Sequence, residues 1–204
     1  MKVLGNERSG AIFSDDADYR YRLWRCWNPE LPRACFVLLN PSTADEIEND
    51  PTIERQQRRV MQWSKAKGGF DSSLFPGDLW YVAPPELRRF GSIEIVNAFA
   101  YRSTDPGSLY IVDDPVGADN DTAILNATTY AHGSGGIIVC GWGSHAEFGE
   151  RDFELRKFFR RHNLPVSAFK INAGGTPSHP LYLPYSMRPR AWDLDSGTLG
   201  AEVV

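Results

Sequence analysis

The sequence lacks any apolar run close to the roughly 20 residues that a membrane-spanning helix needs, so we expect no membrane partner. Its first residues also lack the apolar core of a secretory signal, which favours a cytoplasmic location. Cysteine is scarce, and Cys26, Cys35 and Cys140 are odd in number and widely spaced. That usage is typical of reduced thiols in a cytoplasm and argues against a disulfide framework.

Several motifs of common enzyme classes are missing as well. The chain contains no G-x-S-x-G nucleophile elbow and no phosphate-binding P-loop. Its four histidines show no metal-ligand spacing, so we expect no metal site. The net charge of −4 argues against indiscriminate binding to nucleic acid, although it leaves room for a local basic surface.

The 204 residues contain enough apolar side chains, 42% of the total, for one domain with a full core. Alternation of apolar and basic residues predicts a half-exposed strand, and continuous apolar runs predict buried strands. These strands are expected at 19–27, 34–40, 92–100, 136–143 and 166–171. Helices are expected between them, at 50–69, 119–132 and 144–162.

Local signals set the predicted ends of these helices. Asp50 followed by Pro51 is typical of a helix start, and the pair Gly68–Gly69 is typical of an end. Ser144 with Glu147 fits a capping box. The remaining segments are predicted as an irregular or hairpin lead-in at 1–20, an inserted loop at 71–91 and a proline-rich coil at 173–192.

Strands that alternate with helices predict βαβ units. We therefore expect an α/β fold, a three-layer αβα sandwich around a central, mostly parallel four-stranded sheet. The whole chain, 1–204, is expected to form this single domain, with the loop at about 71–91 inserted into it.

Polar clusters follow the predicted buried strands. The stretch Asn40-Pro41-Ser42-Thr43-Ala44-Asp45 follows the first, Asn97 ends the second, and Gly141-Trp142-Gly143-Ser144 follows the third. His179 lies beyond the fourth strand. In open α/β sheets, ligands bind beyond the carboxyl ends of parallel strands, so these residues are expected to share one site.

Each member of this set has a purely structural alternative. Asn40 before Pro41 is also ordinary turn chemistry. Asn97 is as compatible with a buried amide that ties loops together as with ligand contact, and a loop histidine such as His179 is more often structural or solvated than catalytic. Asp50 is better explained as a helix cap than as a catalytic acid.

Six motifs resemble, in order, an uncharacterised family of bacterial and phage proteins marked by an N-P-S-T-A-D sequence. They are LNPSTAD, DPTIERQ, VNAFAYRSTDP, DPVGADND, CGWG and PSHPLYLP, and they span about residues 19–192. This resemblance identifies relatives but implies no activity.

A more distant resemblance does imply one. Leu39-Asn40-Pro41-Ser42 is similar to the first motif of the mismatch-specific branch of the uracil-DNA glycosylase superfamily, and His179-Pro180-Leu181 is similar to its last motif. Asn97 and the strand that ends in Trp142-Gly143 correspond in order to the two motifs between them. The resemblance implies hydrolysis of an N-glycosidic bond without a metal or other cofactor.

The same resemblance implies a role for each residue. As catalytic residues, Asn40 would orient the attacking water, His179 would donate to the departing base, and Asp45 would assist by its charge or as a base. Residues implied to bind the base are Asn97, Phe99, Tyr101, Trp142, Trp80 and Tyr81. Residues implied to hold DNA phosphates are Ser42, Thr43, Arg102, Ser144, Ser178 and Lys170.

We therefore expect a monofunctional DNA glycosylase that acts as a monomer on duplex DNA with an extruded base. A pocket edged by Trp80 and Tyr81 would accept a bulky modified pyrimidine. The occurrence of the family in phages and bacteria suggests a role in phage defence. Two alternatives remain open, a nucleotide- or nucleoside-processing enzyme for a free small molecule and a non-catalytic module that binds modified DNA.

Overall fold

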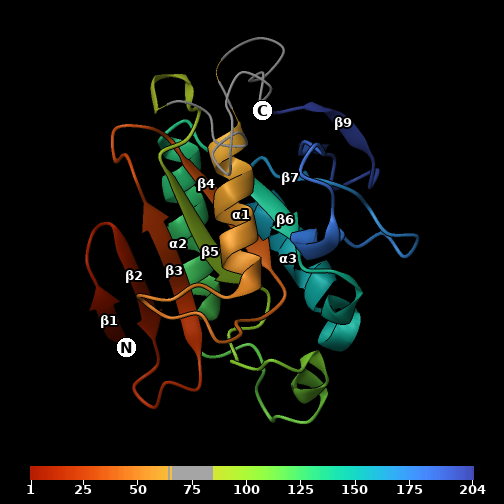
Figure 1. The fold of residues 1–204 in the computed structure, drawn as a ribbon. Coiled ribbons are helices and arrows are strands. Elements are labelled where there is room, and N and C mark those ends of the chain that lie inside the picture. The colour runs from red at the N-terminus through yellow and green to blue at the C-terminus, as the bar shows by residue number, and fades with distance from the viewer. Residues whose placement is uncertain (64, 66–84) are drawn as a thin grey trace.

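A computed structural model describes residues 1–63, 65 and 85–204, which form a nine-stranded sheet with helices on both faces (Figure 1). The strands lie in the order β1-β2-β3-β5-β4-β6-β7-β8-β9. Their bounds are β1 Lys2–Gly5, β2 Ser9–Phe13, β3 Arg20–Cys26, β4 Arg33–Leu38, β5 Ser92–Asn97, β6 Ile137–Gly141, β7 Ser167–Ala168, β8 Arg190–Trp192 and β9 Leu199–Glu202.

The predicted fold class, a three-layer sandwich around a mostly parallel four-stranded sheet, is wrong. The sheet is mixed and has nine strands. Only the pairings β5–β4, β4–β6 and β6–β7 are parallel, whereas the five pairings toward both edges are antiparallel. The outermost strands escape sequence-based prediction because they are short and largely exposed, so they lack an apolar run.

Three α-helices cover the sheet (Figure 1). Helix α1 (Pro51–Gln62) packs on one face, while α2 (Asn120–Gly133) and α3 (Arg151–Arg161) pack on the other. Successive residues of β4 supply the two cores in turn: Phe36 and Leu38 contact the α1 side, and Cys35 and Val37 contact the α2 side. Strand β4 is thus buried on both faces.

Helix α1 begins as the sequence predicts. The Asp50 carboxylate accepts a hydrogen bond from the Ile53 backbone N–H at 2.9 Å, and Pro51 occupies the first helical position. The helix ends at Gln62, however, and not at Gly68–Gly69. Trp63 turns to an extended conformation, and its buried indole packs against the Phe36, Phe90 and Phe169 rings.

Other predicted elements are shorter or divided. The Ser144–Glu147 capping box is absent, because residues Ser144–Glu150 form the 3-10 helix η4, which has no side-chain cap. Gly149 and Glu150 then adopt positive φ angles of 59° before α3 begins. The strand predicted at 166–171 pairs only over Ser167–Ala168. Lead-in residues form the β1–β2 hairpin, and the predicted coil at 173–192 includes the 3-10 helix η5 (Pro180–Tyr182) and β8.

Arg59 anchors α1 to the segment that follows β7. Its guanidinium is buried and donates to the carbonyl oxygens of Pro184 at 2.7 Å and Leu183 at 2.8 Å, with a longer bond to that of Pro180. Its Cζ atom lies 4.7 Å from the centre of the Phe169 ring. No carboxylate within the described ranges forms an ion pair with it. Burial lowers its pKa to about 10, so it remains charged at neutral pH.

Replacing Arg59 with methionine is expected to lower the free energy of unfolding by about 3 kcal/mol, because partly buried carbonyl oxygens lose charged donors. Urea denaturation followed by circular dichroism measures this change. Arg161→Met, at an exposed position on α3, is the matched control and is expected to stay within about 0.5 kcal/mol of the original protein. Equal effects of the two substitutions would contradict the anchoring role.

Candidate functional site

The carboxyl ends of the four parallel strands meet at one edge of the sheet. Beyond β4 and β5 the ladder continues, since the backbone N–H groups of Ala98 and Phe99 donate to the carbonyls of Leu38 and Leu39. Alternation along the strands places Asn40 and Asn97 on the face that α1 covers, together with Leu38 and Ile95. The two amides thus lie on one face, at the edge of the sheet where the sequence predicts the strand ends to converge.

Asn40 fastens two loops at this edge. Its Nδ2 atom donates to the Ser103 carbonyl at 2.8 Å and to that of Pro41 at 3.0 Å, and the Ser103 N–H donates back to the Pro41 carbonyl at 2.9 Å. The side chain is half-buried. Because Nδ2 is engaged in this way, Oδ1 is the part of the amide that can accept a hydrogen bond from a ligand or a water.

A pocket of about 300 Å³, the rim pocket, lies next to these loops. Its lining residues are Ala17, Asp18, Ser42, Thr43, Tyr101, Arg102, Ser103 and Thr104. Three of the predicted phosphate-binding residues, Ser42, Thr43 and Arg102, are thus brought together. Arg102 is held by a bond from Nη1 to the Ala17 carbonyl and by its stacking 5.0 Å from the centre of the Phe13 ring. Two hydroxyl groups beside a fixed guanidinium are suited to a phosphate or carboxylate.

His179 lies just before η5, beside the glycine exit of β6. A Cβ atom on Gly143 would lie 3.7 Å from the His179 Cβ, which locates the imidazole next to that exit. Its Nδ1 atom accepts a hydrogen bond from the Leu181 backbone N–H at 3.4 Å. In the neutral ring, the proton is therefore on Nε2, which becomes a donor. Burial lowers the pKa of His179 to about 4, partly opposed by the negative charge of Asp50.

Of the two acidic residues considered from the sequence, Asp50 acts on His179. It is buried, and its charge also opposes the effect of burial on Arg20, whose pKa burial lowers to about 10. Asp45 instead accepts backbone N–H bonds from Ile47 at 2.8 Å and Glu48 at 2.7 Å, and these bonds lower its pKa. A carboxylate stabilised in this way is a weak base.

Two buried amides lie beneath α1. Asn97 is 2% exposed and Gln56 is fully buried. Within residues 1–63, 65 and 85–204, the Oδ1 atom of Asn97 and both polar atoms of the Gln56 side chain have no hydrogen-bond partner and are closed to solvent. The Asn120 side chain fixes the end of β5 by donating to the Asn97 and Ala98 carbonyls. Unpaired buried amides cost roughly 1–3 kcal/mol each, so they mark a place where polar partners are expected.

Sequence reasoning overlooked Gln56. The only available signal is its position in the apolar stripe of α1, between Ile53 and Val60. A polar residue at such a position faces the core instead of solvent.

The predicted base-stacking residues do not gather at this site. Phe99 and Trp142 are buried on the opposite face of the sheet, in the core formed with α2 and α3. The Trp142 indole donates to the Asp152 carboxylate at 2.7 Å and stacks on Phe159. Tyr101 lines the rim pocket. Trp80 and Tyr81 lie outside the residues that the structure describes.

The other predicted phosphate contacts are also separate from the rim pocket. Ser144 and Lys170 are exposed. Ser178 is 8% exposed, and its hydroxyl donates to the Asn172 side chain. Among the described residues, no group of three or more His, Cys, Asp or Glu side chains could hold a metal ion. No helix in the same ranges is long and apolar enough to cross a membrane.

Gly141 has no side chain, and Pro180, which follows His179, occupies the space that a side chain would fill. A Cβ atom at this position would lie 2.8 Å from Pro180 Cδ, so Gly141→Ala is expected to lower the free energy of unfolding by about 1–3 kcal/mol through overpacking. Gly133→Ala is the control, because a Cβ there meets nothing within 4 Å, and it is expected to be neutral or stabilising. Thermal denaturation compares the two variants. A stable Gly141→Ala protein would contradict this packing.

His179 also predicts a pH dependence of stability. Its folded pKa of about 4 lies below the ordinary value of 6.5, so between these values the unfolded chain binds a proton that the folded chain does not. The free energy of unfolding should therefore fall by about 3 kcal/mol as the pH decreases from 6.5 through 4. His179→Gln should lack this component, whereas His132→Gln, at an exposed position, should retain it. Denaturant titrations across this range test the prediction, and parallel curves for all three proteins would exclude it.

Comparison with known proteins places this site in a family. No curated protein and no solved structure matches the chain. A family model described as a protein of unknown function (DUF1643) matches residues 20–71 and 82–181, and thereby covers most of the sequence and nearly all of the residues discussed above. The predicted membership in an uncharacterised domain family is confirmed, because the chain belongs to the DUF1643 family.

Proposed function

We propose that this chain is a cytoplasmic DNA N-glycosylase that hydrolyses the N-glycosidic bond of an extruded, modified pyrimidine and leaves an abasic site, with a role in phage defence. The proposal depends mainly on the protonation state of His179. Its half-buried ring is neutral at physiological pH, and the Leu181 N–H bond to Nδ1 directs the proton to Nε2. A neutral donor suits a departing base that gains negative charge, since it stabilises the charge without first being deprotonated.

Asn40 supports the second half of the reaction. N-glycosidic hydrolysis leaves a sugar with oxocarbenium character that a water must attack. The Oδ1 atom of Asn40 is the free acceptor of an amide whose Nδ2 is tied to the Ser103 and Pro41 carbonyls. We assign it the role of orienting the water, and we assign the electrostatic role to Asp50, since its charge reaches His179 while Asp45 caps a turn.

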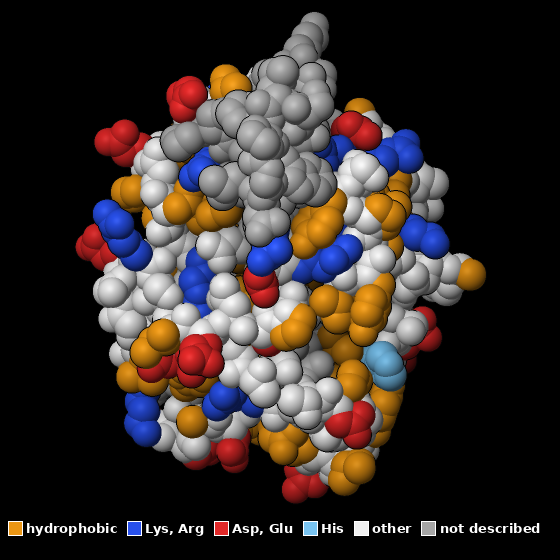
Figure 2. Space-filling view, in the orientation of Figure 1, with side chains coloured by type: hydrophobic (Ala, Val, Ile, Leu, Met, Phe, Trp, Pro, Cys, Tyr) orange, Lys and Arg blue, Asp and Glu red, His pale blue; other side chains and the backbone are white. Residues whose placement is uncertain are grey.

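The rim pocket supports a phosphorylated substrate. Ser42, Thr43 and Arg102 line it, and Asn40 is adjacent in the chain to the first of these loops. On the face that carries α1, basic and acidic side chains are interspersed instead of gathered into one basic area (Figure 2). DNA contact in this proposal is therefore local, at the rim pocket.

The same interspersed charge favours a second candidate, which is the same reaction on a free nucleotide. The net charge of −4 and a pocket of about 300 Å³ suit a single phosphorylated nucleoside. Salt distinguishes the two candidates, because DNA affinity falls steeply as salt is raised when several phosphates are contacted.

Incubation with duplexes that contain 5-hydroxymethylcytosine, uracil or unmodified pyrimidines, followed by alkaline cleavage, tests the proposal. We expect strand breaks at one of the pyrimidines, and a loss of about 100-fold or more in rate for His179→Ala. Asn40→Ala should also lose activity, whereas the exposed His132→Ala should not. Nucleotides incubated in parallel and analysed for free base test the second candidate.

Two results would contradict the proposal. One is the absence of abasic sites from every duplex together with the absence of free base from every nucleotide. The other is activity that survives both His179→Ala and Asn40→Ala in variants with unchanged circular dichroism spectra. Tight binding to modified DNA without turnover would instead indicate a binding module.

A further inference from the structure

A second and larger pocket, the outer pocket, lies on the opposite face of the sheet. It has a volume of about 510 Å³ and is formed by β1, β2, β3 and the carboxyl-terminal part of α2. Arg33 and Ser92, at the amino ends of β4 and β5, also line it. The outer pocket is therefore remote from the rim pocket in both face and edge, and the proposed glycosylase activity does not use it.

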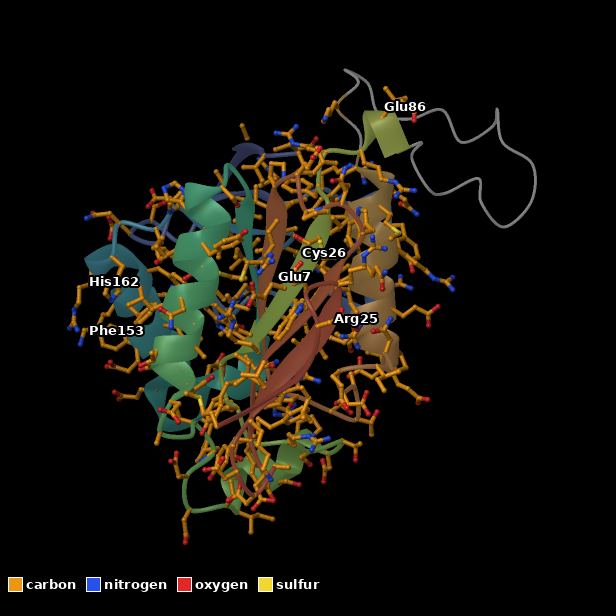
Figure 3. The ribbon with its side chains drawn as sticks, turned by 90° about the vertical axis from the view of Figure 1, so that its left-hand side faces the viewer. Glu7, Arg25, Cys26, Glu86, Phe153 and His162 are labelled. Carbon is orange, nitrogen blue, oxygen red and sulfur yellow. The ribbon has the colours of Figure 1, made fainter. Side chains whose placement is uncertain are left out.

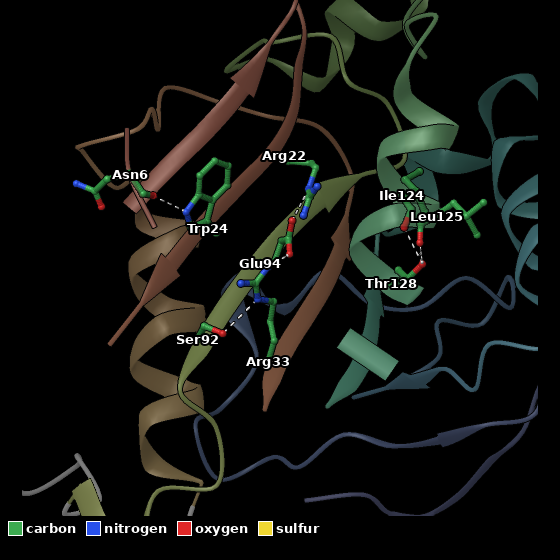
Figure 4. A network of polar contacts seen from close by, with 9 residues as sticks. All are labelled: Asn6, Arg22, Trp24, Arg33, Ser92, Glu94, Ile124, Leu125 and Thr128. Atoms are coloured by element: carbon green, nitrogen blue, oxygen red, sulfur yellow. Dashed lines mark hydrogen bonds and ion pairs between the residues drawn. The ribbon is translucent and has the colours of Figure 1, made fainter. Parts of the chain in front are cut away.

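A fully buried glutamate organises the cations of the outer pocket. Glu94 of β5 forms ion pairs with Arg22 of β3 at 2.5 Å and with Arg33 of β4, and Arg33 also donates to the Ser92 hydroxyl (Figure 4). Glu94 is 0% exposed, whereas the side chains of Arg22 and Arg33 are 23% and 17% exposed. The carboxylate thus lies beneath two guanidinium groups that reach the pocket.

These guanidinium groups keep unused donors. In the part of the chain that the structure describes, Arg22 donates through Nε alone, and Arg33 donates through Nε and Nη1. Their Nη groups without partners remain partly open to solvent, since they are not among the buried unpaired atoms. Arg22, Arg33 and Glu94 together carry a local charge of +1, while the carboxylates of Glu7 and Glu30 are exposed elsewhere in the lining. A singly charged anion is therefore favoured at the two guanidinium groups.

Trp24 supplies a flat apolar surface beside these cations. Its indole N–H donates to the Asn6 carbonyl at 2.9 Å (Figure 4), which fixes the orientation of the ring. Gly10 of β2 pairs with Trp24, and a Cβ on Gly10 would lie 2.2 Å from the ring. The indole therefore lies flat against the backbone of β2, and its other side lines the pocket. Tyr130 of α2 is a second ring of the lining, and the Arg33 guanidinium lies 4.6 Å from its centre.

The pocket also contains a cysteine thiol, whose rate of alkylation can report on ligand binding. Cys26 of β3 is half-buried and lines the pocket together with the exposed Glu7 and Glu30. Cys26 and Glu7 are labelled in Figure 3. Cys35 and Cys140 are 0% exposed, and burial raises the pKa of both thiols well above the ordinary value. In the folded protein, an alkylating reagent therefore reaches Cys26 and not the other two thiols.

We propose that the outer pocket is a binding site for a small organic anion that combines one carboxylate or phosphate group with a flat ring. The anionic group binds the free guanidinium donors of Arg22 and Arg33, and the ring lies against the indole of Trp24. Glu94 positions both arginines, while the exposed Glu7 and Glu30 accept hydrogen bonds from hydroxyl or amino groups of the ligand. The volume of about 510 Å³ suits a ligand of this size.

Alkylation of Cys26 by iodoacetate, an anion, and by iodoacetamide, its neutral counterpart, tests the site in the intact chain. An ordinary thiolate reacts more slowly with the anion, because two negative charges repel each other. We expect the iodoacetate rate at Cys26 to saturate with concentration and the iodoacetamide rate to stay linear. Arg22→Met should lower the ratio of the two rates about tenfold, and Arg161→Met should leave it unchanged.

A competition experiment needs no variant. Benzoate combines a carboxylate with a flat ring, and benzamide has the same shape without the charge. Benzoate should slow the iodoacetate reaction at Cys26, while benzamide at equal concentration should not. Peptide mass analysis identifies the alkylated cysteine. Equal protection by the two compounds, or a linear iodoacetate rate that Arg22→Met leaves unchanged, would overturn the proposal.

Discussion

Arg59 determines the shape of the sheet edge at which the parallel strands end. Its buried guanidinium bonds to three backbone carbonyls and, among the described residues, to no carboxylate. Arg59 adds charged hydrogen bonds to the packing of the segment after β7, whose Leu183 and Met187 contact the core beneath α1. The Phe169 and Tyr185 rings lie beside its guanidinium. Because the acceptors belong to consecutive turns of one segment, the path of that segment cannot change without exposing the charge or leaving it unpaired. Arg59 also donates to the Pro180 carbonyl, and His179 directly precedes Pro180 in the chain. The backbone position of His179 therefore depends on Arg59.

Local signatures account for what the sequence predicts of the fold. Asp50 caps α1, and the apolar run at Cys35–Leu38 forms a strand buried on both faces, since each depends on residues that are close together in the chain. The strands at the sheet edges have no such signature. All four residues of β1 are exposed, and β8 pairs with β7 through only two residues, so these pairings depend on backbone partners that no local pattern reports.

The sequence predicts which residues lie near one another where chain direction decides their placement, and it fails where side-chain direction decides it. Asn40, Asn97, Ser42, Thr43 and Arg102 reach the rim because parallel strands end there and the Ser103–Pro41 hydrogen bond joins their loops. Trp142 is one residue from Gly141, and a step of one residue along a strand reverses the face. Phe99 lies beyond the end of β5, where the alternation breaks and its ring enters the core formed with α2 and α3. The position of Gln56 in the apolar stripe of α1 indicates that it faces the core, but the lack of a partner for its amide is visible only in the tertiary structure.

The strand order has a consequence for synthesis of the chain on the ribosome. Strand β4 lies between β5 and β6, and both partners follow it in the sequence. At bacterial or eukaryotic translation rates, its apolar residues wait roughly 5–20 s between their own synthesis and that of Gly141 at the end of β6. During that interval the nascent chain carries an unpaired apolar strand edge that can pair with other chains. The chain is therefore expected to depend on chaperones at the ribosome, and the segment that contains His179 is added only after this vulnerable stage has passed.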